Sequence, residues 1–115
     1  MQSQLQMRQL SLTLSVAAQM HPDDMADAAR LGFRSIINNR PDFEAGPEQP
    51  THAAIEAAAR AAGLDYRFLP VAPLYQSPEE IAAFARLLRE LPAPVLAFCR
   101  SGARSTKLFV AAIAL

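Results

Sequence analysis

The seven residues from Cys99 to Ser105 have side chains that can act together on an anion. They read Cys-Arg-Ser-Gly-Ala-Arg-Ser and directly follow the apolar run Val95 to Phe98. Where a strand turns tightly into a helix, backbone N–H groups point into one small space, and the helix dipole adds positive potential there. Gly102 permits a backbone conformation that a side chain would penalise. We therefore predict an anion-binding loop with Cys99 at its centre.

The same loop should ionise the thiol of Cys99. A free thiol has a pKa of about 8.5, and helix N-termini with cationic neighbours lower it. Arg100 and Arg104 add permanent positive charge, and a planar guanidinium holds a tetrahedral oxyanion by two hydrogen bonds. Ser105 adds a hydroxyl for the thiolate or the departing anion. A lone cysteine after an apolar strand is more often a small buried hydrophobe. Two arginines and a glycine would serve packing poorly, so we predict a nucleophilic thiolate.

The composition is that of one ordinary globular domain. The chain has 115 residues, of which 51% are hydrophobic and 19% are charged, and eleven Lys and Arg balance eleven Asp and Glu. This balance excludes general attraction to nucleic acid or to an acidic membrane. No run approaches the ~20 apolar residues of a membrane span. The single cysteine excludes an internal disulfide, and the N-terminus shows no export signal, so we expect a cytoplasmic protein.

The rest of the chain alternates between strand-like and helix-like runs. Ser77 and Glu80 form a capping box pattern with Pro78 at the first helical position, which marks the clearest helix start. Strand and helix in alternation predict an α/β fold with a mainly parallel sheet of about four strands, flanked by helices. We expect residues 1–11 to be an N-terminal extension and residues 12–115 to be the domain. The predicted strands are Leu12–Ala17, Phe33–Ile37, Tyr66–Val71 and Val95–Phe98.

Ligands of such sheets bind beyond the carboxyl ends of the strands. This rule brings the loop Asn38–Asp42 and the loop Val71–Gln76 beside the cysteine loop. Arg40 and Asp42 are therefore further candidates for the site, although they can equally serve to hold their own loop together. His21 and His52 have no acidic or cysteine partners at ligand spacing, so we predict neither a metal site nor a cofactor.

The chain resembles the beta-lactamase-hydrolase-like protein, phosphatase-like domain family over most of its length from Leu12. This resemblance implies a fold like that of the dual-specificity and other protein tyrosine phosphatases. Relatives occur fused to, or encoded near, metallo-beta-lactamase-like persulfide dioxygenases, which implies a functional link to sulfide metabolism. The resemblance rests on the segments Ser15–Gln19, Leu31–Asp42, Ala62–Tyr66, Pro70–Val71 and Phe98–Ser105.

Two departures from the phosphatase pattern favour sulfur chemistry. Four residues separate Cys99 from Arg104, one fewer than in the protein tyrosine phosphatases, and Cys-Arg-x-Gly-x-Arg is instead the loop pattern of rhodaneses. The loop that carries the general acid of those phosphatases corresponds to Ala72–Gln76, which holds no carboxylate. Losing a general acid costs about 10²- to 10⁴-fold in rate, whereas sulfite or a thiolate leaves without a proton. We therefore predict transfer of sulfane sulfur from thiosulfate or a persulfide, through a Cys99 persulfide.

Two alternatives stay open from the sequence. One is a phosphatase that cleaves phosphate esters through a Cys99 phosphocysteine with Asp42 as the acid. The other is a non-enzymatic module that senses or docks an anion. The partner in every case is a small anion, namely thiosulfate, a persulfide or a phosphate ester. We expect Cys99, Arg104 and Asp42 to be catalytic, and the substrate-binding residues to be Arg40, Arg100, Ser101, Gly102, Ala103 and Ser105.

Overall fold

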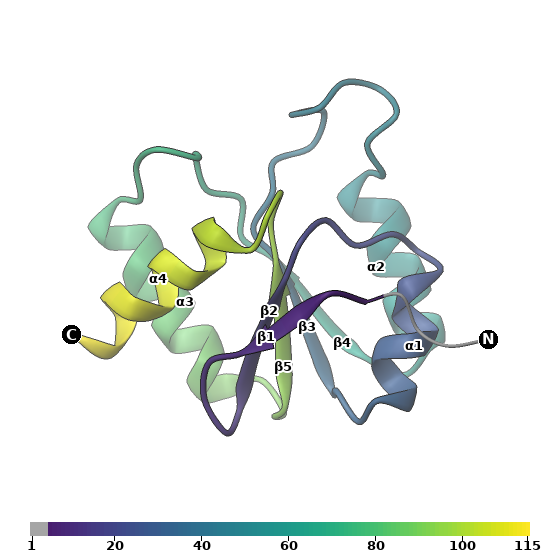
Figure 1. Ribbon diagram of the computed structural model, residues 1–115, viewed down its shortest axis with the longest axis horizontal. Coiled ribbons are helices and arrows are strands. Elements are labelled where there is room, and N and C mark those ends of the chain that lie inside the picture. The colour runs from purple at the N-terminus through teal and green to yellow at the C-terminus, as the bar shows by residue number, and fades with distance from the viewer. Residues whose placement is uncertain (1–4) are drawn as a thin grey trace.

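The computed structural model describes residues 5–115 and shows a five-stranded sheet between two pairs of helices (Figure 1). The strand order is β1-β2-β5-β3-β4; β1 runs antiparallel to β2, and every other pair is parallel. The α/β fold with a mainly parallel sheet is thus confirmed. The strands are β1 Met7–Gln9, β2 Leu14–Ala17, β3 Ser35–Asn38, β4 Asp65–Phe68 and β5 Val95–Phe98. The helices are α1 Asp24–Arg30, α2 His52–Ala61, α3 Pro78–Glu90 and α4 Ala103–Ile113.

Strand β1 is the element that the sequence did not predict. It lies within residues 1–11, which we had expected to be an extension, and pairs with β2 from Met7 opposite Ala17 to Gln9 opposite Ser15. All three of its residues are exposed. Because β1 is stabilised by pairing with an edge strand and not by burial, it lacks the apolar alternation by which strands are found in a sequence.

The central strand β5 is buried on both faces of the sheet, so each of its four residues is apolar. Leu96 and Phe98 pack into one hydrophobic core with α1 and α2, whereas Val95 and Ala97 pack into a second core with α3 and α4. Figure 1 shows the two helix pairs on opposite faces of the sheet. All four residues of β5 are buried, as is typical of a parallel strand covered on both faces.

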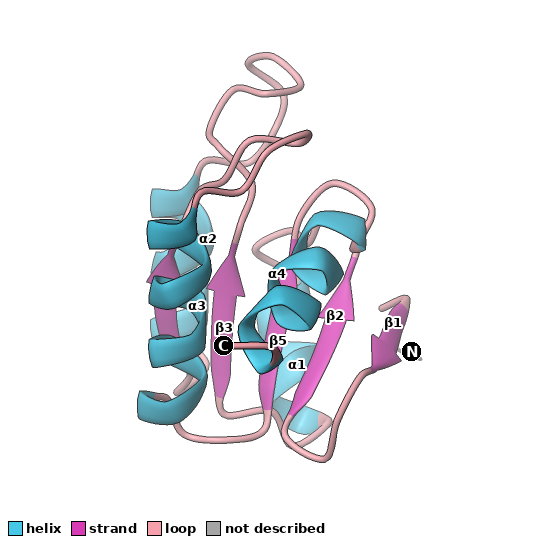
Figure 2. Ribbon diagram, turned by 90° about the vertical axis from the view of Figure 1, so that its left-hand side faces the viewer, coloured by secondary structure: helices cyan, strands magenta, loops and turns pink. Residues whose placement is uncertain are grey.

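The parallel strands end at one edge of the sheet, and the loops that follow them gather there. Figure 2 shows the loops after β3, β4 and β5 at the same end of the molecule, beyond the arrowheads of the strands. Asn39 N–H donates to the carbonyl of Phe98 at 2.8 Å, and Val71 N–H donates to the carbonyl of Asn39 at 3.1 Å. The three segments expected at this edge are therefore joined by their backbones. No helix among the described residues is long and apolar enough to span a membrane.

The start of α3 carries the predicted capping box. Ser77 Oγ accepts from the N–H of Glu80 at 3.1 Å, and Ser77 N–H donates to Glu80 Oε1 at 2.8 Å.

We predict that Ser77→Ala lowers the free energy of unfolding by about 1 kcal/mol, because one helix N–H loses its acceptor. Urea denaturation measures this loss. Ser77→Thr, which keeps a hydroxyl, should retain most of the stability; an unchanged midpoint for Ser77→Ala would contradict the prediction.

Candidate active site

The cysteine loop begins where β5 ends and is tied to the end of β2. Cys99 N–H donates to the carbonyl of Ala17 at 3.4 Å, and Gln19 N–H donates to the carbonyl of Arg100 at 3.2 Å. Gly102 precedes α4 with a φ of 92°, in the left-handed region. A Cβ there would meet its nearest atom, the Ala17 carbonyl oxygen, only at an ordinary 3.5 Å. Backbone conformation and not space is therefore the reason for glycine at this turn.

The sulfur of Cys99 faces backbone N–H groups. Gly102 N–H donates to Cys99 Sγ at 3.1 Å. Burial raises the pKa of the Cys99 thiol, but hydrogen bonds from the Ser105 and Ser101 N–H groups, the Ser105 hydroxyl and the Gly102 N–H more than offset it, so the pKa lies below its ordinary 9.0. Although Cys99 is only 1% exposed, it lines a cavity of about 160 Å³. The loop thus stabilises the thiolate, and Cys99 adjoins a cavity at the mouth of the loop.

The hydroxyl of Ser105 is shared between the sulfur and Asn39. Ser105 Oγ donates to Asn39 Oδ1 at 2.8 Å, while Asn39 Nδ2 donates to the carbonyl of Leu69 at 2.9 Å. The carbonyl fixes which way the Asn39 amide faces, because a flipped amide would place two oxygens together. A hydroxyl carries one proton, so Ser105 serves Asn39 or the thiolate at any moment. The backbone N–H groups of the loop are the constant donors to the sulfur.

Arg104 lies under the loop with its guanidinium largely occupied. Its Nη1 donates to Glu44 Oε2 and to the carbonyl of Val71, both at 3.1 Å, and its Nη2 donates to Glu44 Oε1 at 3.1 Å. Arg104 is 6% exposed. Its Nε is buried and has no hydrogen-bond partner among the described residues. Glu44 therefore anchors the guanidinium by two nitrogens, while Nε keeps an unused hydrogen-bond donor among the described residues.

Glu44 was not predicted as part of the site. Its Oε1 also accepts from Arg40 Nε at 2.9 Å, and Arg40 Nη1 donates to Gln19 Oε1 at 3.0 Å. Burial raises the pKa of Glu44, but the hydrogen bonds and charges of Arg104 and Arg40 outweigh it and hold the pKa below 4.5. The sequence signal was a carboxylate four residues after Arg40. It was insufficient because Arg104 is 60 positions away.

The side chain of Asp42 contacts the first residue of α2. Its Oδ1 accepts from the N–H of His52 at 2.8 Å, and the His52 ring stacks on Phe68 with centroids 4.0 Å apart. Asp42 is not among the described residues that line the cavity at Cys99 or the adjoining cavity at Arg40. The structure brings together every other predicted site residue at these two cavities, apart from Gly102 and Ser105, which contact the sulfur from beneath. No group of three or more potential metal ligands occurs among residues 5–115.

Phe43, between Asp42 and Glu44, has a strained backbone. Its φ is 63°, a conformation that bulky residues rarely adopt, and the residue is 63% exposed. Gly46 N–H donates to the carbonyl of Phe43 at 3.0 Å and closes the turn. Asp42 holds the preceding side to α2, and Glu44 holds the following side to two arginines. The strain persists because both neighbours are anchored.

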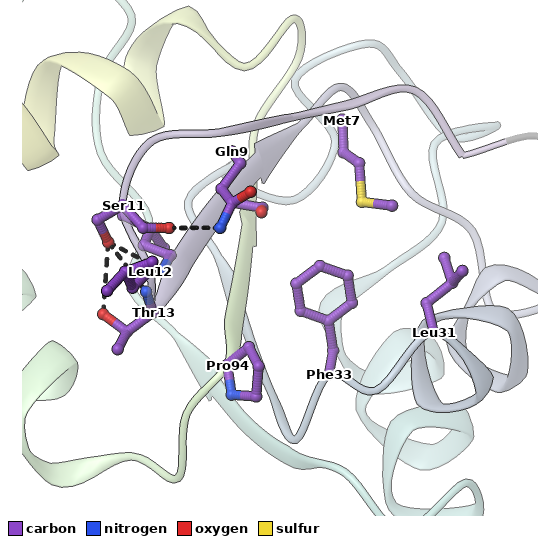
Figure 3. Close-up of a pocket in the computed structure, with 10 residues that line it drawn as sticks. Met7, Gln9, Ser11, Leu12, Thr13, Leu31, Phe33 and Pro94 are labelled. Carbon is purple, nitrogen blue, oxygen red and sulfur yellow. Dashed lines mark hydrogen bonds between the residues drawn. The ribbon is translucent and has the colours of Figure 1, made fainter.

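A further cavity lies at the opposite end of the strands (Figure 3). Its volume is about 380 Å³, and residues just before β2, β3 and β5 contribute to it. No charged residue is among the described residues that line it. It therefore has no group suited to act on an anion. The lining side chains labelled in Figure 3 are Met7, Gln9, Ser11, Leu12, Thr13, Leu31, Phe33 and Pro94.

A mainly parallel sheet with a cysteine loop between its last strand and its last helix is the fold of the protein-tyrosine-phosphatase-like phosphatases. The profile of the family described as beta-lactamase hydrolase-like protein, phosphatase-like domain, matches residues 6–115. The chain belongs to this family.

Its relatives include longer proteins. The chain is 43% identical over 96 residues to a beta-lactamase hydrolase-like protein of Xylella fastidiosa, and 40% identical over 97 residues to one of Agrobacterium fabrum. Each alignment covers 84% of this chain and 22% of the relative. The chain thus spans about a fifth of the curated relatives that it matches.

Solved structures share the fold. A candidate phosphatase from Neisseria meningitidis is 32% identical, with a TM-score of 0.81 over 88% of this chain and 71% of that one. TpbA of Pseudomonas aeruginosa in complex with pTyr is 20% identical, with a TM-score of 0.64 over 89% of this chain and 58% of that one. The second likeness shows the fold alone. The family and its neighbours support the phosphatase alternative better than the sulfurtransferase that we predicted first.

We predict that Cys99 ionises at a lower pH than an ordinary thiol and that Ser105→Ala raises its pKa. The substitution removes one of the donors that stabilise the thiolate and keeps the backbone N–H. Thiolate absorbance in the ultraviolet, titrated against pH with Cys99→Ala as the blank, measures both effects. A wild-type midpoint at or above that of a free thiol would contradict the prediction.

We predict that Glu44→Gln lowers the free energy of unfolding by about 2 kcal/mol at neutral pH, because two buried guanidiniums lose their countercharge. The folded-state pKa of Glu44 is depressed, so its stabilisation is complete above the pKa of the unfolded state and is lost as pH falls through the folded value. The gap between wild type and Glu44→Gln should therefore shrink below about pH 4. Denaturant titrations at several pH values test this; a gap that does not depend on pH would refute it.

Proposed function

We propose that this domain hydrolyses phosphate monoesters through a phosphocysteine at Cys99. The observation that carries the proposal is a thiol of lowered pKa that lines a small cavity beside a buried arginine. A thiolate, and not a thiol, is the attacking species. The membership of the chain in a phosphatase-like family supports phosphate over other tetrahedral anions.

The proposed reaction has two displacements at phosphorus. The Cys99 thiolate attacks the phosphorus, a P–S bond forms, and the P–O bond to the leaving group breaks with its electron pair on oxygen. Water then attacks the phosphocysteine and releases phosphate, and the sulfur regains its electron pair. Arg104 Nε and the loop N–H groups hold the oxygens of the transferring group, whose charge needs fixed donors. In the second displacement the sulfur is the leaving group, and the Ser105 hydroxyl can then turn from Asn39 and donate its hydrogen bond to the sulfur.

Phosphatases of this fold protonate the leaving oxygen, whereas we propose that this domain releases it as an anion. Glu44 is kept ionised by two arginines, so it has no proton to give at neutral pH. Asp42, which the sequence suggested as the acid, accepts a helix N–H. We therefore propose that esters with stable leaving groups, such as aryl phosphates, are the better substrates. The aryl phosphate pTyr bound by TpbA and the citrate bound by a yeast PP-IP phosphatase support small anions as ligands.

Aryl phosphate turnover tests the proposal. We expect wild type to release phosphate from 4-nitrophenyl phosphate, and Cys99→Ser to lose more than about 10³-fold in kcat/KM because the nucleophile is replaced by a poor one. Asp42→Asn should lose little if Asp42 serves the helix alone, and about 10²-fold or more if it is the acid. Far-ultraviolet circular dichroism confirms that each variant folds. Wild-type activity that survives Cys99→Ser would overturn the phosphocysteine.

Sulfur transfer is the second candidate. Its specific support is the four-residue spacing between Cys99 and Arg104, together with a site whose carboxylates are already engaged. The Cys99 thiolate would attack the outer sulfur of thiosulfate, form an S–S bond and release sulfite. Intact mass after thiosulfate treatment should then show one added sulfur atom in wild type and none in Cys99→Ala. A preparation that gains no sulfur and turns over aryl phosphate excludes this candidate, whereas neither activity points to an anion-sensing module.

A further inference from the structure

We propose that a second anion subsite adjoins the Cys99 cavity and is formed by Arg40 and Arg100. It would take a second anionic group, a carboxylate or a phosphate, carried by the same phosphate monoester. The inference rests on the proposed phosphatase function, because it concerns the part of the substrate that is not transferred.

The subsite is a cavity of its own. It has a volume of about 360 Å³, against about 160 Å³ for the cavity at Cys99. The two cavities share Pro73, Arg100 and Arg104 as lining residues. A group bound at Cys99 is therefore next to the second cavity, which adds Arg40, Glu44 and Ala45.

The charges of the second cavity do not cancel. The described residues of its lining include three arginines, Arg40, Arg100 and Arg104, but only one acidic residue, Glu44. Glu44 is bound by Arg104 and by Nε of Arg40. The Arg40 side chain donates from Nε and Nη1, and within the described part of the chain its Nη2 has no acceptor. The exposed side chain of Arg100 has none there either. Two guanidiniums thus keep free donors for a ligand.

Two of the three arginines of the subsite are largely buried and held in place by hydrogen bonds. Arg40 is 7% exposed and Arg104 is 6% exposed. Gln19 from the end of β2 holds Nη1 of Arg40, and Glu44 holds Nε, so the free Nη2 has a fixed position. A charge held in place at a largely buried position binds an anion more strongly than a mobile surface lysine, because less solvent screens it and less side-chain entropy is lost.

Matched aryl phosphates test the subsite. The isomers of carboxyphenyl phosphate carry a second anion, the carbamoylphenyl phosphates have the same shape without it, and 1,3-phenylene bisphosphate replaces the carboxylate by a phosphate. For wild type we expect at least one charged ester to exceed its uncharged counterpart by about tenfold in kcat/KM, mostly through KM, as for one charge-assisted hydrogen bond. The carboxylate and bisphosphate arms then show which anion is preferred.

Variants locate the effect. Arg100→Gln should reduce the preference, because it removes one of the two guanidiniums that have free donors. Arg89→Gln, the same charge change at an exposed position in the last turn of α3, should preserve it. A wild type that turns over every ester without preference for the charged ones would overturn the subsite and leave the phosphatase proposal standing.

A binding measurement separates the two proposals if no ester is hydrolysed. Calorimetry with Cys99→Ser and the non-hydrolysable carboxyphenylphosphonates and carbamoylphenylphosphonates requires no turnover. Tighter binding of the charged phosphonate, weakened in Cys99→Ser/Arg100→Gln, supports the subsite although the phosphatase has failed. Equal binding of the two phosphonates refutes the subsite.

Discussion

The burial of Arg104 is the constraint on which the rest of the site depends. A guanidinium with 6% exposure needs a partner, since an unpaired buried charge costs several kcal/mol. Glu44 supplies that partner from the loop after β3 and binds Arg40 with the same carboxylate. The loop after β3 therefore cannot move independently of the cysteine loop. The Glu44 carboxylate fixes the guanidiniums of Arg40 and Arg104 before a ligand binds. The side-chain entropy of these two arginines is therefore lost during folding and not during binding.

Sequence reasoning succeeded where one residue type has one good physical explanation. The apolar run of β5, the capping box at Ser77 and the glycine before α4 each predicted their local structure, and the strand–helix alternation predicted the sheet. It failed where stabilisation comes from distant partners. Strand β1 has no buried face, and Glu44 acquires its role only when residues 60 positions apart meet. The catalytic role of Asp42 stays a prediction, because a carboxylate that accepts a helix N–H and one that gives up a proton are indistinguishable in a sequence.

Different observations favour phosphorus and sulfur as the atom that Cys99 attacks. The family and the fold favour phosphoryl transfer, while the short spacing from Cys99 to Arg104 resembles that of sulfurtransferases. The structure adds that Glu44, the carboxylate beside the loop, accepts hydrogen bonds from Arg104 and Arg40, which lower its pKa. In the proposed reaction, catalysis rests on the Cys99 nucleophile and on fixed positive charge, which favours leaving groups that are stable as anions.

Cys99 is the single cysteine of these 115 residues, and this has a consequence for its fate under oxidative stress. A thiolate of lowered pKa reacts with peroxide to give a sulfenic acid, which a neighbouring thiol would normally capture as a disulfide. Here no resolving thiol exists within the domain. Reactivation of an oxidised site must come from a thiol on another molecule or another domain, and small reductants that fit the cavity at Cys99 are suited to supply it.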